Sequence, residues 1–206
     1  MTTANTATTP QNNRDAILTA ALELFSQKGV AGSSIRQIAQ RAGVSSALIF
    51  HHFESKEDLL REVLQNKNTL LDNIFTLLHE PNLNSTAFAN RFITIYVDVF
   101  RPGTTTHQFF RLSMDMNNTT SDVDQLFSEM NSTLSQAIAD FLEQQKDKGA
   151  LADNINTLQA AQNFLGGFLW ILINHMHCRD DWATVVRPLA ESHVAFWLHS
   201  ISAHTA

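Results

Sequence analysis

The chain of 206 residues has very little of what marks secreted or membrane-spanning proteins. Its one cysteine, Cys178, excludes a disulfide within the chain, so we expect a buried thiol there, and only a bond between subunits stays open. No apolar run reaches the roughly 18 to 20 residues that span a bilayer, so we expect no membrane contact. The N-terminal MTTANTATTPQNN is polar and lacks the basic and apolar regions of a signal peptide. We therefore expect a cytoplasmic protein.

The sequence also lacks the sustained alternation of apolar and polar residues that predicts β-strands. Helical periodicity dominates instead, and with 44% apolar residues the chain can bury a core in one or two domains. We expect an all-α protein of nine helices, separated by Gly, Pro, Asn and Asp signals. The expected helices lie at about 13–28, 34–42, 45–52, 55–79, 85–101, 104–117, 120–148, 155–178 and 182–203.

The most informative segment is 33–56, SSIRQIAQRAGVSSALIFHHFESK, whose spacing predicts two short helices joined by a three-residue turn. Gly43 can adopt the positive φ of such a turn. Ser34 and Gln37 form a capping box at the start of the first helix, and Ser45 is placed to cap the second. This pattern predicts a helix-turn-helix, which places its second helix in the major groove of DNA. The apolar or small residues that hold the two helices together are Ile38, Ala39, Ala42, Val44 and Ile49.

The expected recognition helix runs from Ser45 to His52 and has little more than two turns. Side chains near its N-terminus and along one face should therefore contact DNA. Ala47 and Leu48 are apolar and suit a thymine methyl, whereas Ser46 and His51 can hydrogen-bond to base edges or phosphate. The expected base readers are Ser45, Ser46, Ala47, Leu48 and His51. The residues expected on the phosphate backbone are Ser33, Ser34, Arg36, Arg41 and Lys56.

An ordinary helical hairpin would explain the motif alone, but the similarity extends further. Residues 14–60 resemble, position by position, the DNA-binding domain of the TetR (tetracycline-repressor) family of bacterial transcription regulators. The resemblance implies three parts: a flexible arm (1–12), a three-helix DNA-binding domain (13–54) and a helical domain for ligand binding and dimerisation (55–206). The positions that carry it are Ile17-Leu18, Ala20-Ala21, Leu24-Phe25, Gly29, Ser33-Ser34-Ile35, Ile38-Ala39, Ala42-Gly43-Val44-Ser45, His51, Phe53, Ser55-Lys56-Glu57 and Leu59.

Two positions depart from the family pattern. Phe50 stands where many members have Tyr, and Ser46 stands where Lys is common. Each departure removes a donor to phosphate, and one such hydrogen bond contributes about 1 kcal/mol net. We therefore expect modest affinity for the DNA backbone.

Positive charge is scarce, because 14 Lys and Arg residues stand against 20 Asp and Glu, for a net charge of −6. A DNA-binding protein needs a basic surface, so the distribution of charge matters. Residues 14–61 hold six basic and five acidic side chains, whereas the rest of the chain holds eight and fifteen. We expect the acidic surplus to lie away from DNA.

The C-terminal region is rich in aromatic residues, which suit either a filled core or a cavity. The resemblance implies a cavity for an apolar or aromatic small molecule. Polar residues that can orient such a ligand are Arg91, His107, Arg111, Asn163, Asn174 and His175. The residues expected to line the cavity are Phe92, Tyr96, Phe100, Phe109, Phe110, Met114, Phe127, Met130, Trp170 and Asn174.

The last two expected helices carry apolar stripes, and Gly166 and Gly167 allow close approach of another backbone. The resemblance implies that these helices pair across a two-fold axis in a homodimer. Packing inside the chain would use the same stripes, so both alternatives stay open. The residues expected at the interface are Leu165, Phe168, Leu172, Leu189, Phe196 and Trp197.

The sequence predicts no metal site, cofactor or catalytic set. His175 and His177 point about 200° apart on a helix, so only His175 and Cys178 share a face. No nucleophile and base stand in a recognisable arrangement, so an enzyme is not expected. The resemblance implies a homodimeric repressor that binds a palindromic operator in double-stranded DNA and leaves it when a small hydrophobic effector binds. The alternative is an effector-independent DNA-binding factor that recruits protein partners.

Overall fold

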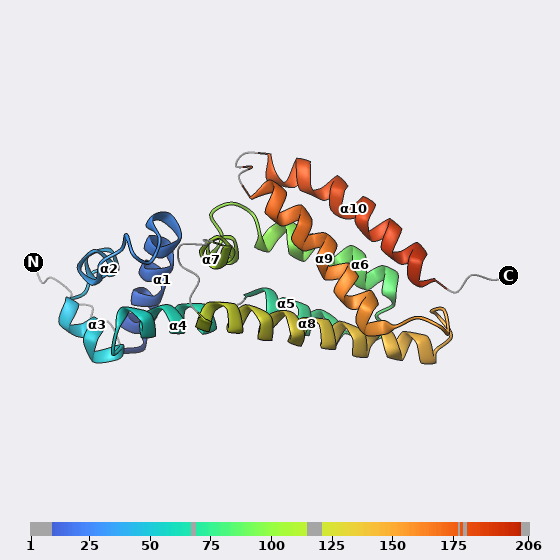
Figure 1. Ribbon diagram of the computed structural model, residues 1–206, viewed down its shortest axis with the longest axis horizontal. Helices are drawn as coiled ribbons and strands as arrows, with labels where there is room; N and C mark the ends of the chain where they lie inside the picture. The colour runs from blue at the N-terminus through green and yellow to red at the C-terminus, as the bar shows by residue number, and fades with distance from the viewer. Residues whose placement is uncertain (1–9, 67–68, 115–120, 177, 179–180, 203–206) are drawn as a thin grey trace, which may run out of the picture. The chain divides into compact units, whose positions relative to one another are not determined.

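The computed structural model describes residues 10–66, 69–114, 121–176, 178 and 181–202. Within these ranges the regular elements are all helices, apart from an isolated bridge between Leu151 and Ser202, so the all-α prediction is confirmed. The helices are α1 (Pro10–Lys28), α2 (Ile35–Ala42), α3 (Ser46–His52), α4 (Lys56–Asn66), α5 (Thr69–Leu78), α6 (Ser85–Val99), α7 (Thr105–Met114), α8 (Ser121–Asp147), α9 (Thr157–His175) and α10 (Trp182–Ile201) (Figure 1).

The described residues form ten helices where nine were predicted, and several helix ends differ by one to three residues from the predicted ones. The helix expected over 55–79 is observed as α4 and α5, on either side of residues 67–68, which lie outside the described part of the chain. The first helix begins at Pro10 rather than near Asn13, so residues 10–12 of the expected arm are helical. Proline is favoured at the first position of a helix because its fixed φ suits the helix and its missing N–H has no partner there. Residues 1–9 of the arm lie outside the described residues.

The described residues divide into two compact units, one with residues 10–66, 108–114 and 121–126 and the other with residues 69–107, 127–176, 178 and 181–202. In the first unit α1 packs against α2 and α4. Gly29 ends α1 with a φ of 72°, and its N–H donates to Phe25 O at 2.9 Å. The fully buried side chains of this unit include Ile17, Leu18, Phe25, Ile38, Ile49, Phe53 and Leu59.

The second unit has an aromatic core between α6, α9 and α10. The Phe92 ring lies 4.8 Å from the Phe164 ring and 4.6 Å from the Phe168 ring, measured between centroids. The Tyr96 hydroxyl donates to Phe168 O at 2.9 Å, and burial raises the pKa of that hydroxyl far above its ordinary value. The Trp197 indole N–H likewise donates to a backbone carbonyl, Ala160 O, at 2.8 Å. These rings and hydrogen bonds fill the interior, so the filled-core alternative describes this cluster.

A close approach of α9 and α10, which lie side by side in Figure 1, depends on one glycine. A Cβ added to Gly167 would lie 2.1 Å from His193 Cε1, whereas one added to Gly166 would meet no atom within 4 Å. His193 Nε2 lies 2.9 Å from Phe164 O, and its ring stands edge-on to the Phe168 ring. Gly167 therefore makes room for the ring that joins the two helices.

The described helices include none with both the length and the apolar character required to cross a membrane. Cys178 is half-buried rather than buried.

Candidate functional site

The helix-turn-helix forms through local hydrogen bonds at its caps. Ser34 Oγ accepts from Gln37 N at 3.3 Å while Gln37 Oε1 accepts from Ser34 N at 3.1 Å, which is the predicted capping box. Gly43 has a φ of 71° at the end of α2. Ser45 Oγ accepts from Leu48 N at 3.1 Å and caps α3. The predicted turn and both predicted caps are confirmed.

Helix α3 buries one side and exposes the other. Ile49 is fully buried, whereas Ala47, Phe50 and His51 are exposed. Ser46 and Leu48, also expected to read bases, are half-buried at the edge of this outer side. Phe50 is 57% exposed, and sequence reasoning assigned it no contact of its own. Its spacing of three residues from Ala47 would have placed it on the same face.

Ser33 has a structural role instead of the expected phosphate contact. Its side chain is 4% exposed, and its hydroxyl donates to Gly29 O at 2.8 Å and to Leu24 O at 3.1 Å. Leu24 lies near the C-terminal end of α1, and Gly29 directly follows the helix. Ser33 therefore closes the end of α1. Ser34 and Arg36 are exposed, as a contact with DNA requires.

The two other residues expected on phosphate have partners within the chain. Lys56 is half-buried, and its Nζ donates to Val30 O at 2.9 Å and to Ser33 O at 3.3 Å, so it holds the segment between α1 and α2. Arg41 pairs with Glu23 at 2.7 Å, although its side chain is 61% exposed. Sequence reasoning missed both contacts because the partners are 18 or more positions away in the chain.

Two further contacts of the first unit also escaped the sequence analysis. Arg14 pairs with Glu62 and lies over the Phe53 ring, 5.5 Å from its centroid. These two contacts join α1 to α4 and to Phe53, which directly follows α3. They therefore help to hold the recognition helix in place.

The residues expected to line an effector cavity separate into different environments. Phe92, Tyr96, Phe100 and Phe110 are buried, and Met130 is half-buried. The side chains of Phe109, Met114 and Phe127 lie outside the described part of the structure. Trp170 is 69% exposed and Asn174 is exposed, with its Nδ2 donating to Trp170 O, so neither lines an interior cavity. The reason is helical geometry, because these positions lie on the side of α9 away from Phe164 and Phe168.

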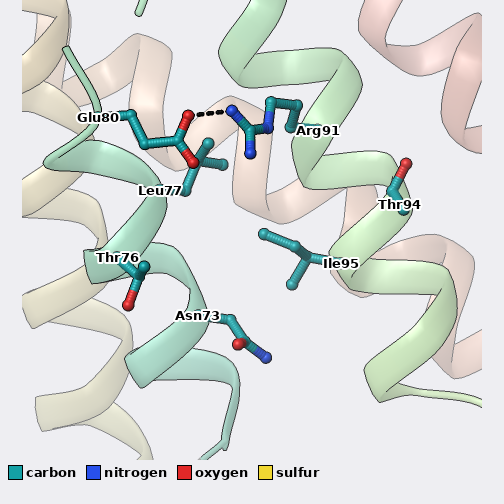
Figure 2. A pocket seen from close by; sticks show the side chains of 7 residues that line it. All are labelled: Asn73, Thr76, Leu77, Glu80, Arg91, Thr94 and Ile95. Carbon is teal, nitrogen blue, oxygen red and sulfur yellow. Dashed lines mark hydrogen bonds and ion pairs between the residues drawn. The ribbon is translucent and has the colours of Figure 1, made fainter.

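A groove of about 420 Å³ lies elsewhere in the second unit, between α5 and α6. Figure 2 shows Asn73 and Ile95 directed toward the gap between the two helices, and an ion pair between Glu80 and Arg91 at one end. Arg91 is the only expected ligand-orienting residue among the groove's lining. Asn73, Thr76 and Leu77 are spaced as residues on one face of α5, and Glu80 follows the helix. This spacing is visible in the sequence and could have indicated the groove. The lining residues are Asn73, Thr76, Leu77, Glu80, Arg91, Thr94 and Ile95.

The expected dimer-interface residues also separate. Phe168, Leu172 and Trp197 are each only 2% exposed, so they pack within their own chain and are corrected to core residues. A shift of one position on a helix turns the side chain by about 100°, which is why their neighbours face outward. Leu165 is half-buried, and Leu189 and Phe196 are exposed. The large exposed apolar residues of α9 and α10 are Leu158, Leu169, Trp170, Ile173, Leu189 and Phe196.

No group of three or more His, Cys, Asp and Glu side chains in the described residues is arranged to hold a metal ion.

The capped helix-turn-helix, supported by α1 and α4, is the architecture of a helix-turn-helix DNA-binding protein. Residues 17–63 match the family described as bacterial regulatory proteins, tetR family. This segment of the chain therefore matches the DNA-binding segment of the TetR family, as the resemblance indicated.

Relatives and solved structures agree with this family. The chain is 37% identical over 62 residues to the HTH-type transcriptional repressor KstR2 of Mycolicibacterium smegmatis, which covers 30% of each protein. The match thus spans less than a third of that relative's length. A TetR-family regulator from Mesorhizobium loti superposes with a TM-score of 0.71 at 23% identity, covering 94% of this chain and 98% of that one. The transcriptional regulator FadR of Bacillus subtilis, in complex with stearoyl-CoA, gives a TM-score of 0.73 at 16% identity, covering 89% and 97%. At these identities the structures establish the fold.

Proposed function

We propose that the chain is a sequence-specific DNA-binding regulator of transcription that acts as a homodimeric repressor. The observation that carries the proposal is the capped helix-turn-helix, whose recognition helix exposes Ala47, Phe50 and His51. The match of residues 17–63 to the TetR family supports it, as does the similarity of this segment to a repressor. Residues 13–54 form the proposed DNA-binding domain, and residues 55–206 the proposed ligand-binding and dimerisation domain.

Binding to duplexes selected from a random-sequence library tests this function. Arg36→Ala removes an exposed cation of α2, so it should weaken binding to selected and random duplexes alike and lower the salt slope by about 1 per subunit. His51→Ala removes a group that can bond to base edges, so it should chiefly relax sequence preference. Equal loss of selectivity in both variants would contradict these roles. Failure of the wild-type chain to select any duplex would refute the function.

The dimer is proposed to form through the exposed apolar side of α9 and α10. Trp170 and Phe196, 69% and 76% exposed, present large apolar surfaces that a soluble chain would cover with a partner. A two-fold partner would offer the same surface, which makes the contact self-complementary. Such a dimer supplies the two recognition helices that a palindromic operator requires.

A charge placed at Phe196 tests this interface. Phe196→Glu should bury an unpaired carboxylate and convert the dimer to monomer in size-exclusion chromatography with light scattering. Thr184→Glu is the matched control, because Thr184 is exposed on the same helix and lies about 140° around it from Leu189. A dimer of unchanged affinity in Phe196→Glu would place the interface elsewhere.

The effector site is proposed to be the groove between α5 and α6. Its volume lies in the usual range for small-molecule sites, and Leu77 and Ile95 supply apolar surface beside the polar groups of Asn73 and Thr94 (Figure 2). This arrangement suits a small, largely apolar molecule with one or two polar groups. A protein of the same fold binds stearoyl-CoA, whose acyl chain is apolar, although its CoA part is larger and more polar than the molecule proposed here.

Filling the groove tests the effector proposal. An effector that binds in the groove should raise the melting temperature of the protein. It should also lower the affinity for operator DNA, commonly about 5- to 150-fold, and operator DNA should lower the affinity for the effector by the same factor. Ile95→Trp should abolish both responses and preserve DNA binding, whereas Asn90→Trp, exposed on the same helix and outside the groove, should preserve both. If a broad panel of apolar and amphipathic compounds changes neither quantity, the effector-independent alternative holds.

A further inference from the structure

The outer face of the recognition helix carries a large apolar side chain that the fold does not use. Phe50 is 57% exposed, while its neighbours Ile49 and Phe53 are 0% and 2% exposed and fill the core behind α3. Phe50 shares the outer face with Ala47 and His51, which lie three residues before it and one after it. The ring therefore projects from the side of α3 that a helix-turn-helix turns toward DNA.

The chemistry of α3 leaves few ways to recognise bases by hydrogen bonds. Its sequence, SALIFHH, contains no Arg, Lys, Asn, Gln, Asp or Glu, the residues that make the most selective contacts with guanine, adenine and cytosine edges. Only Ser46 and the two histidines, His51 and His52, bring polar side chains. The Phe50 ring is thus a large exposed apolar surface on a helix that has few side chains able to hydrogen-bond to bases.

In the major groove the apolar feature of a base pair is the C5-methyl group of thymine. Contact between this methyl and an exposed aromatic ring removes apolar surface of both partners from water, which favours binding. Cytosine and both purines offer no methyl at that edge, so the contact discriminates among base pairs.

We propose that Phe50 is a specificity-determining residue that contacts the C5-methyl group of a thymine in each operator half-site. This inference rests on the proposed DNA-binding function. Ala47, on the same face, borders this contact. The operator of this protein consequently requires thymine at the position that faces Phe50.

The test removes the methyl without changing any hydrogen-bonding group. Duplexes selected by the full-length wild-type protein are resynthesised with deoxyuridine in place of each conserved thymine, one symmetric pair at a time. At the position facing Phe50 the loss should be about fourfold for one half-site and about 15-fold for both, the value for one buried methyl-sized group. At other positions the replacement should have little effect.

Protein variants then identify the partner of that methyl. Phe50→Ala should bind the thymine and uracil duplexes equally well, whereas Phe50→Tyr, which keeps the ring, should retain the preference for thymine. Because Phe50 is exposed, both variants should keep the wild-type melting temperature, which separates loss of contact from loss of fold.

Three results would overturn the inference: selected sites without a conserved thymine, no sensitivity to uracil at any position, or the same sensitivity in Phe50→Ala as in the wild type. Each of these leaves a sequence-specific DNA-binding protein intact. Failure to select any duplex refutes the proposed function itself, and this inference with it, so the two failures are distinguishable.

Discussion

Replacing Gly167 with alanine should destabilise the chain, although alanine is the better helix former. Gly167 lies within α9, where Gly→Ala alone would stabilise the helix by about 1 kcal/mol. The new Cβ, however, would stand 2.1 Å from Cε1 and 2.4 Å from Nε2 of His193. The imidazole ring must therefore move.

Two interactions measure the cost of moving that ring. His193 Nε2 is 2.9 Å from Phe164 O, a hydrogen bond of about 1 kcal/mol net. The ring also stands edge-on to Phe168, with centroids 5.3 Å apart, a contact of about 1 kcal/mol. If the ring turns away, the loss of about 2 kcal/mol exceeds the helix-propensity gain by about 1 kcal/mol. If surrounding side chains hold it, overpacking costs about 1 to 3 kcal/mol instead. The free energy of unfolding should fall by about 1 to 2 kcal/mol.

Urea and thermal unfolding measure this change, and each kcal/mol should lower the melting temperature by about 2 to 4 °C. In a His193→Ala background the clash is absent, so Gly167→Ala should raise stability by about 1 kcal/mol. A Gly167→Ala variant as stable as the wild type, or equally destabilised with and without His193, would refute the reasoning.

The neighbouring Gly166→Ala is the matched control, because its Cβ would meet nothing within 4 Å in the chain, and it should gain about 1 kcal/mol. A loss there would show that a second chain contacts this face closely, and it would not bear on His193.

Three further predictions concern polar groups. Ser33→Ala should lower the free energy of unfolding by about 1 kcal/mol, since two carbonyls lose their donor, and should leave the selected DNA sequence unchanged. Lys56→Met should lower it by about 1 to 2 kcal/mol in urea unfolding, because Val30 O and Ser33 O lose a charged donor. Tyr96→Phe should cost about 1 kcal/mol near neutral pH by deleting the bond to Phe168 O. Burial raises the pKa of Tyr96, so the unfolded chain releases this proton first, and wild-type stability should fall by up to about 1.4 kcal/mol per pH unit above about pH 10. Tyr96→Phe should lack this loss, and because Tyr96 is the single tyrosine, tyrosinate absorbance should appear only on unfolding.

The sequence alone determined the helix-turn-helix. Its signals are local, since a capping serine bonds to a backbone N–H three residues away and a glycine supplies its own positive φ. Ser34, Gly43 and Ser45 therefore act in the structure as their spacing predicted. The helical character of the rest of the chain follows from periodicity, which also needs no knowledge of distant neighbours.

Only the tertiary structure decided which charged side chains form hydrogen bonds or ion pairs within the chain. The sequence predicted that Lys56 and Arg41 contact the phosphates of DNA. Their partners in the structure, Val30 O and Glu23, come from segments that folding brings near. A pairing across such distances in sequence leaves no local pattern.

The tertiary structure also decided which side of each C-terminal helix faces the core. Helix α9 is apolar around most of its circumference, so its sequence does not distinguish the stripe with Phe164 and Phe168 from the stripe with Leu169 and Trp170. Packing against α10 and against Phe92 of α6 makes that choice, because burying one stripe leaves the other, about 100° to 200° around the helix, in solvent. The aromatic content of the sequence likewise predicts a large apolar interior. Only the fit of the rings to one another determines whether that interior is a cavity or, as at Phe92, a filled core.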